Sequence, residues 1–152
     1  MRALGVALRI LFVCAAILLS ACSSSARKSN LNVFTVAVAG NQVFVGESIT
    51  FGTNGTFRMK SINGDPTSCK GKFVYDRFPK GKAKFSCTNG ETGNLRITAE
   101  GNLSGTGQGT SSLGPVQIIF GYSLSVVNSK VRFPDNTQLK VVGNRYVLAT
   151  GR

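Results

Sequence analysis

The sequence predicts an all-β domain, an antiparallel meander that closes into a small barrel or sandwich. Short segments alternate apolar and polar residues at the period of a β-strand, and glycine-containing turn signals separate them. The chain has 18 glycines and no capped stretch with helical spacing, which argues against helices. We therefore expect about eight to twelve short strands.

The first residues have the pattern of an export signal rather than of a folded element. Arg2 and Arg9 mark a positive region, residues 10–19 are apolar, and the run ends in "LSAC", residues 19–22. This ending resembles the lipobox of bacterial lipoproteins. The resemblance implies that residues 1–21 are a lipoprotein signal peptide and that the Cys22 thiol is acylated at the mature N-terminus. The alternative is an ordinary secretory signal followed by a chance cysteine.

Residues 22–30 are expected to form a lipidated cysteine and a flexible tether. The stretch "SSSARKSN", residues 23–30, is small and polar and shows no apolar periodicity. Ser23 stands where an aspartate commonly signals inner-membrane retention in Gram-negative lipoproteins. The resemblance therefore implies an outer-membrane protein that contacts the lipid membrane through its acyl anchor.

Residues 31–152 are expected to form a single β-rich domain with one modest core. Without Arg2 and Arg9 the chain carries sixteen lysines and arginines and six acids, a formal charge of +10. The first predicted strands are "NVFTVAV" (32–38), "QVFV" (42–45), "SITF" (48–51) and "TFRMKSI" (56–62). Gly40–Asn41 and "TNGT", residues 53–56, are the turns between them.

The second half repeats the strand pattern. The predicted strands are "LRITAE" (95–100), "VQIIFGYSLSVV" (116–127), "SKVRF" (129–133) and "QLKVV" (138–142). "PDNT" and "VGNR" are expected to be turns.

The segment between Cys69 and Cys87 predicts a disulfide-closed hairpin. These are the only cysteines of the exported domain, so a disulfide between them is the default interpretation. If the chain turns at Phe78, Cys69 lies opposite Cys87. Strand alternation then places an apolar face on the side of the disulfide and a cationic face on the other side. In the chain-entropy model a loop of this length contributes about 3 kcal/mol of stability.

The cationic face of the hairpin is the candidate binding surface. Its lysines are Lys70, Lys72, Lys80, Lys82 and Lys84. Lys72 opposite Lys84 is an unfavourable pair, and the crosslink offsets this repulsion. Two interpretations stay open: the lysines bind an anionic ligand, or they keep an exposed sheet face soluble and block edge pairing.

The glycine-rich "GTGQG", residues 105–109, does not predict a nucleotide-binding loop. Gly105, Gly107 and Gly109 alternate, so they share one face of a strand, and no helix or Lys-Ser/Thr pair follows. Glycines at this spacing mark a bend, or a place where a large neighbouring side chain covers the backbone.

A broader pattern covers residues 69–121. "CKG", "CTNGETGNLRIT", "LSGTGQG" and "IIFG" together resemble small proteobacterial envelope lipoproteins with a Cys-x-Gly, Cys-x-x-Gly and Gly-x-Gly pattern. Those proteins are generally uncharacterised, so the resemblance implies a β-rich envelope lipoprotein and no activity.

The composition gives little support to an enzyme. The chain has no histidine, which removes the commonest general base and the usual nucleophilic dyads and triads. Its six acids are scattered, and with both domain thiols paired only weak oxygen ligands remain for a metal. We expect a non-enzymatic protein without a cofactor or a metal site.

Two functions remain open for the domain. One is a structural or assembly role in the envelope, exerted through sheet edges and other envelope proteins. The other is a binding module for anionic envelope polymers: lipopolysaccharide phosphates and other lipid headgroups, peptidoglycan or other anionic polysaccharide, or nucleic acid. One continuous basic patch on the folded domain would favour the second function.

Overall fold

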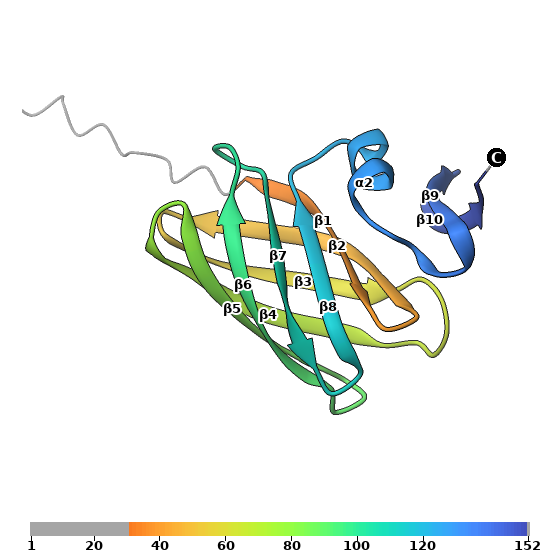
Figure 1. The fold of residues 1–152 in the computed structure, drawn as a ribbon, viewed down its shortest axis with the longest axis horizontal. Helices are drawn as coiled ribbons and strands as arrows, with labels where there is room; N and C mark the ends of the chain where they lie inside the picture. Colours follow the sequence, from red (N-terminus) through yellow and green to blue (C-terminus); the bar gives the residue numbers. More distant parts are fainter. Residues whose placement is uncertain (1–30, 152) are drawn as a thin grey trace, which may run out of the picture.

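The computed structural model describes residues 31–151, which form a closed eight-stranded barrel followed by a small C-terminal unit (Figure 1). Each barrel strand pairs antiparallel with the next along the chain, and β8 pairs back with β1. The strands are β1 (Asn32–Ala39), β2 (Gln42–Phe51), β3 (Asn54–Ser61), β4 (Ser68–Arg77), β5 (Lys80–Cys87), β6 (Thr92–Ala99), β7 (Gly105–Ser111) and β8 (Gly114–Phe120). The predicted all-β meander is confirmed, and it closes as a barrel.

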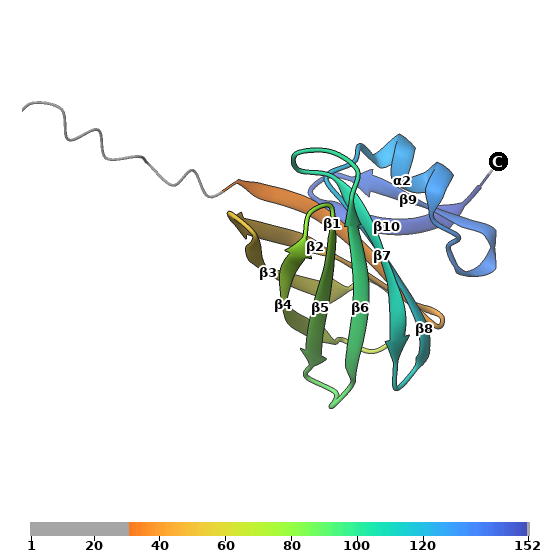
Figure 2. The same ribbon diagram turned by 60° about the vertical axis from the view of Figure 1, so that its left-hand side comes forward.

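The C-terminal unit lies against the outside of the barrel (Figures 1 and 2). It consists of α2 (Leu124–Lys130), the 3-10 turn η1 (Pro134–Asn136) and the hairpin β9 (Thr137–Val142) and β10 (Arg145–Thr150). Between residues 31 and 151, no helix is long and apolar enough to cross a membrane.

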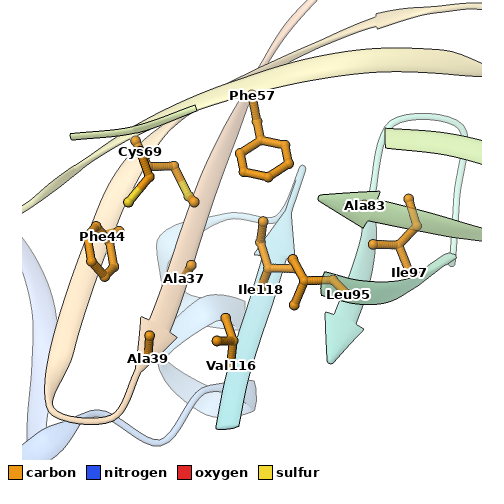
Figure 3. Close-up of a cluster of buried hydrophobic side chains, with 11 residues drawn as sticks. Ala37, Ala39, Phe44, Phe57, Cys69, Ala83, Leu95, Ile97, Val116 and Ile118 are labelled. Atoms are coloured by element: carbon orange, nitrogen blue, oxygen red, sulfur yellow. The ribbon is translucent and has the colours of Figure 1, made fainter. Parts of the chain in front are cut away.

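Two hydrophobic clusters use opposite faces of the same strands. Inward side chains of the barrel form the first cluster, which includes Phe44, Phe57 and Leu95 (Figure 3). Outward side chains of β1, β2 and β8 form the second, where Val36, Val43 and Ile119 pack against the C-terminal unit. Because β1 is buried on both faces, it lacks the polar outward side that the free barrel strands show.

Glycines make room for large side chains inside the barrel. The Phe57 ring occupies the space beside Gly71, where a Cβ atom would come within 2.1 Å of the ring. On β7, a Cβ at Gly107 would meet the side chain of Ile118 at 2.6 Å. The interpretation that neighbouring side chains cover the alternating glycines is therefore confirmed for Gly105 and Gly107, whereas at Gly109 the nearest atoms belong to the backbone of β6.

The structure corrects the prediction for residues 116–133. The predicted strand 116–127 ends at Phe120, residues 124–130 are helical, and residues 129–133 form no strand. Gly121 has a φ of 73° and its N–H donates to the carbonyl of Phe34, so the chain turns away from the barrel there. Leu124, Val127 and Val131 then place three apolar side chains at helical spacing on the outer cluster.

One of the two early turns is as predicted, and the other is displaced. Gly40–Asn41 joins β1 to β2 as predicted, and Gly40 has the positive φ, 55°, that favours glycine. Residues 42–45 and 48–51, predicted as separate strands, belong to the single strand β2. The turn that follows comes earlier than predicted, at 52–53.

Candidate binding surface

The β4–β5 hairpin has the predicted register along most of its length. Cys69 lies opposite Cys87, and the two form a disulfide with an S–S distance of 2.05 Å. Lys72 lies opposite Lys84, also as predicted. Near the turn the register shifts, so that Arg77 pairs with Lys80.

The two faces of this hairpin separate as the alternation predicts. Cys69, Phe73, Tyr75 and Phe85 contribute to the barrel core. Burial raises the pKa of the Tyr75 phenol. The five predicted lysines are all exposed on the outer face: Lys70, Lys72, Lys80, Lys82 and Lys84.

The neighbouring strands extend the cationic surface beyond the hairpin. Arg58 of β3 lies opposite Lys70, and Arg96 of β6 lies opposite Lys82. We call this surface the basic face, and its members are Arg58, Lys60, Lys70, Lys72, Lys80, Lys82, Lys84 and Arg96. The sequence analysis missed Arg58, Lys60 and Arg96. The alternation in "TFRMKS" and "NLRIT" already places these three on outward positions, but the pairing partners of β3 and β6 were unknown.

Acidic side chains neutralise little of the basic face. Lys82 and Asp76 form an ion pair at 2.8 Å, and both side chains are largely exposed. Glu47 of β2 lies opposite Arg58 in the register. Within residues 31–151 the other ion pair, between Lys130 and Glu100, lies off this face. Most cations of the basic face are therefore available to an external anion.

A groove of about 840 Å³ adjoins the end of the basic face near the disulfide. Arg58, Lys60 and Lys70 supply positive charge along it. Phe34 of β1 and Tyr146 of β10 also line it, and their rings stack with centroids 5.0 Å apart. The groove thus combines cationic side chains with an apolar wall.

A second polar cluster connects the β6–β7 loop to α2. The Glu100 carboxylate accepts hydrogen bonds from Lys130 at 2.9 Å, Tyr122 at 2.7 Å and Thr106 at 2.8 Å. These hydrogen bonds, that of Lys130 first, lower the pKa of Glu100 to about 2. The same contact raises the pKa of Lys130. Each of these side chains has its hydrogen-bond partner within the cluster. We therefore assign the cluster a structural role, in which it holds α2 against the barrel.

Three further features concern metal ligands, a buried acid and the lipid anchor. In the part of the chain from 31 to 151, no three His, Cys, Asp or Glu side chains are grouped to hold a metal ion. Glu91 is 4% exposed, and neither carboxylate oxygen has a hydrogen-bond partner in that part. The signal peptide, Cys22 and the tether lie outside the described residues, so lipidation stays a prediction.

Comparison with known proteins supports the fold alone. No family model matches the chain, and no curated protein matches it. A solved structure of a redesigned β-barrel, mFAP1, bound to DFHBI, is similar with a TM-score of 0.51 and 14% identity. The alignment covers 66% of this chain and 100% of that chain.

The barrel interior of this chain is filled by its own side chains. The space around Thr35, Ser48 and Tyr75 is about 20 Å³, and the space near Phe44 and Cys69 is about 10 Å³. Binding sites for small organic molecules are typically at least about 300 Å³. The candidate site is therefore on the outer surface of the barrel.

Proposed function

We propose that this protein is a non-catalytic, membrane-anchored binding module that holds an anionic glycan of the cell envelope on its basic face. The observation that carries the proposal is the continuity of that face. Exposed lysines and arginines occupy neighbouring positions on four consecutive strands, β3 to β6. A continuous basic patch favours a binding module, whereas evenly spread charge would favour a surface that is merely kept soluble.

Electrostatics determines the kind of ligand that this face suits. Six of its eight cations are lysines, which are flexible point charges, whereas arginine suits bidentate geometry. Positive potentials from neighbouring strands add, so phosphate or carboxylate groups along a polymer are attracted without a fixed arrangement. Lipopolysaccharide presents phosphates on its sugars, and peptidoglycan presents carboxylates on the peptide stems of its glycan strands. We therefore expect broad, salt-sensitive binding to anionic glycans.

The arrangement of aromatic side chains favours a glycan over nucleic acid. Single-stranded nucleic acid is held by aromatic rings interleaved with the charges. Here Phe57, Phe73 and Phe85, on the strands of the basic face, contribute to the barrel core. The aromatic pair at the groove, Phe34 and Tyr146, is already stacked on itself. Tight binding of DNA would contradict this part of the proposal.

A structural role through protein partners remains the second candidate. Sheet-edge pairing is restricted, since every barrel strand has two strand partners. The β9–β10 hairpin is a separate two-stranded sheet, and it exposes Val141 and Val142 at 52% and 63%. This apolar hairpin end is the observation that favours a protein contact. Crosslinking from this hairpin to an envelope protein, without glycan binding, would favour that role.

The experiment compares two triple variants with the same net charge. The test variant changes Lys72, Lys82 and Lys84 to Gln on the basic face. The control changes three exposed cations of the C-terminal unit to Gln: Arg132, Lys140 and Arg145. Sedimentation with lipopolysaccharide, peptidoglycan fragments and DNA is measured at two salt concentrations.

The expected result follows from the strength of exposed ion contacts. At about 0.5 kcal/mol each, losing three cations weakens glycan binding roughly tenfold at low salt. The control variant should bind as the parent does, and added salt should reduce the difference because it screens exposed charges. Equal binding by both variants, or a parent that binds no glycan at low salt, would leave the lysines as a solubilising face.

A further inference from the structure

Exposed apolar side chains gather at one end of the barrel. In an up-and-down meander alternate turns lie at the same end, which places the β2–β3, β4–β5 and β6–β7 connections together. Phe51, Phe78 and Leu103 lie at these connections, with exposures of 40%, 67% and 41%. Leu31, 48% exposed, directly precedes β1 at the same end. We call these four residues the N-terminal rim.

The opposite end of the barrel has a different surface. Of the large apolar side chains at its connections within the described chain, Leu113 is the exposed one, at 46%. The β3–β4 connection at that end carries the exposed acid Asp65. The exposed apolar side chains are therefore distributed unequally between the two ends.

Packing and hydrogen bonds hold the rim together. Tyr75 and Phe78 have ring centroids 5.8 Å apart, and Phe78 and Leu103 line a shared hollow of about 70 Å³. The Tyr75 N–H donates to the carbonyl of Thr53 at 2.8 Å, and the Ala99 N–H donates to that of Pro79 at 2.8 Å. These contacts join the three connections, so the apolar groups are presented as one surface.

The charges at the rim suit an anionic lipid surface. Arg77 and Lys80 pair across the strands on either side of Phe78. Two acids near this end already have partners: Glu100 accepts hydrogen bonds from Lys130, Tyr122 and Thr106, and Asp76 forms an ion pair with Lys82. Apolar tips next to cations with long alkyl stems are typical of surfaces that lie in the headgroup region of a membrane.

The chain enters the barrel at this same rim. Cys22 lies nine residues before Leu31, and nine residues span at most about 30 Å. We propose that the N-terminal rim docks directly on the anionic lipid surface, with its apolar side chains in the headgroup region. This inference rests on the proposed anchor at Cys22, which would keep the rim within reach of the lipid. Docking would direct the groove and the disulfide away from the membrane.

Single tryptophans provide the test, because the chain has none of its own. Leu103→Trp places a probe on the rim, and Leu113→Trp places a matched probe at a leucine of similar exposure on the opposite end. The full chain is expressed with its own signal and reconstituted into vesicles of phosphatidylethanolamine and phosphatidylglycerol with brominated acyl chains. Phe78→Trp is a second rim probe in case Leu103→Trp disturbs the loop, and circular dichroism checks that each variant folds.

The expected result is a difference between the two ends. Fluorescence of Leu103→Trp and Phe78→Trp should be weaker in brominated vesicles than in the same vesicles without bromine, whereas that of Leu113→Trp should be equal in both. The emission of the two rim probes should also lie at shorter wavelength than that of Leu113→Trp. Equal quenching at both ends, or no quenching at the rim, overturns the inference. The mass of the same preparation separately tests the anchor. A lipidated chain with an unquenched rim would support the anchor and contradict the docking. An unlipidated chain with a quenched rim would contradict the anchor and support the docking.

Discussion

Strands β3 to β6 form one wall of the barrel, and the inner and outer surfaces of this wall have opposite chemistry. The inner surface holds phenylalanines, glycines and the disulfide, and each large ring lies over a neighbouring glycine. The outer surface holds the basic face, where one lysine forms an ion pair. Because side chains alternate along a strand, the core and the charged surface can vary independently. The inside of this wall therefore contributes most of its stability, whereas the proposed binding involves only the outside.

The largest expected effect comes from the inner surface. Phe57 is 3% exposed and its ring fills the space beside Gly71, so Phe57→Ala removes a buried ring and leaves a cavity. We expect a loss of about 3–5 kcal/mol in the free energy of unfolding, measured by urea denaturation. Phe78→Ala, at a phenylalanine that is 67% exposed, is the matched control and should change little. Similar losses for both variants would contradict the assignment of stability to the interior.

A smaller effect of opposite sign is expected on the outer surface. Lys72 and Lys84 lie directly opposite each other, and like charges at such positions repel. Lys72→Gln or Lys84→Gln alone should therefore raise the free energy of unfolding by a few tenths of a kcal/mol. The double variant should gain less than the sum of the two, because either change removes the same repulsion. Strictly additive gains would show that the two ammonium groups do not interact.

The smallest effect concerns the polar contact between the barrel and α2. Folding lowers the pKa of Glu100 from 4.5 to about 2, so its contribution to stability is present above pH 4.5 and is lost as the pH falls toward 2. The melting temperature of the parent should thus fall more than that of Glu100→Gln across this window. Since the carboxylate is exposed, we expect a modest difference, and added salt should reduce it. Parallel plots of melting temperature against pH for the two proteins would show that this contact does not stabilise the fold.

Local pairing could be predicted from the sequence residue by residue, whereas the non-local arrangement could be predicted only as a class, a meander that closes into a barrel or sandwich. The Cys69–Cys87 register and the five outward lysines follow from one turn and strict alternation. The closure of the sheet as a barrel depends on Thr35 meeting Phe120, which no short-range pattern encodes. The contribution of Arg58 and Arg96 to the basic face depends on the order of neighbouring strands.

The C-terminal unit shows why a strand pattern failed. Val126 and Val127 are β-branched and suggest a strand, yet Leu124, Val127 and Val131 also fit a helix. Packing decides between the two, since the outer cluster buries Val127 and Val131 against β1, β2 and β8. Asn128 supports this choice, because its side chain bonds both the N–H and the carbonyl of Leu139. The groove was likewise unpredictable, since Phe34 and Tyr146 meet only after this unit folds back.

The meander order of the strands constrains the order in which the barrel can fold from its N-terminal end. Each hairpin needs only the strand just before it, so β4 and β5 can pair, and their cysteines can be joined, before the later strands have folded. The seam between β1 and β8 is the exception, because its two sides are the first and last strands of the barrel. Until β8 arrives, β1 keeps an open edge and an uncovered apolar side. The first strand to form is therefore the last to have both of its edges paired.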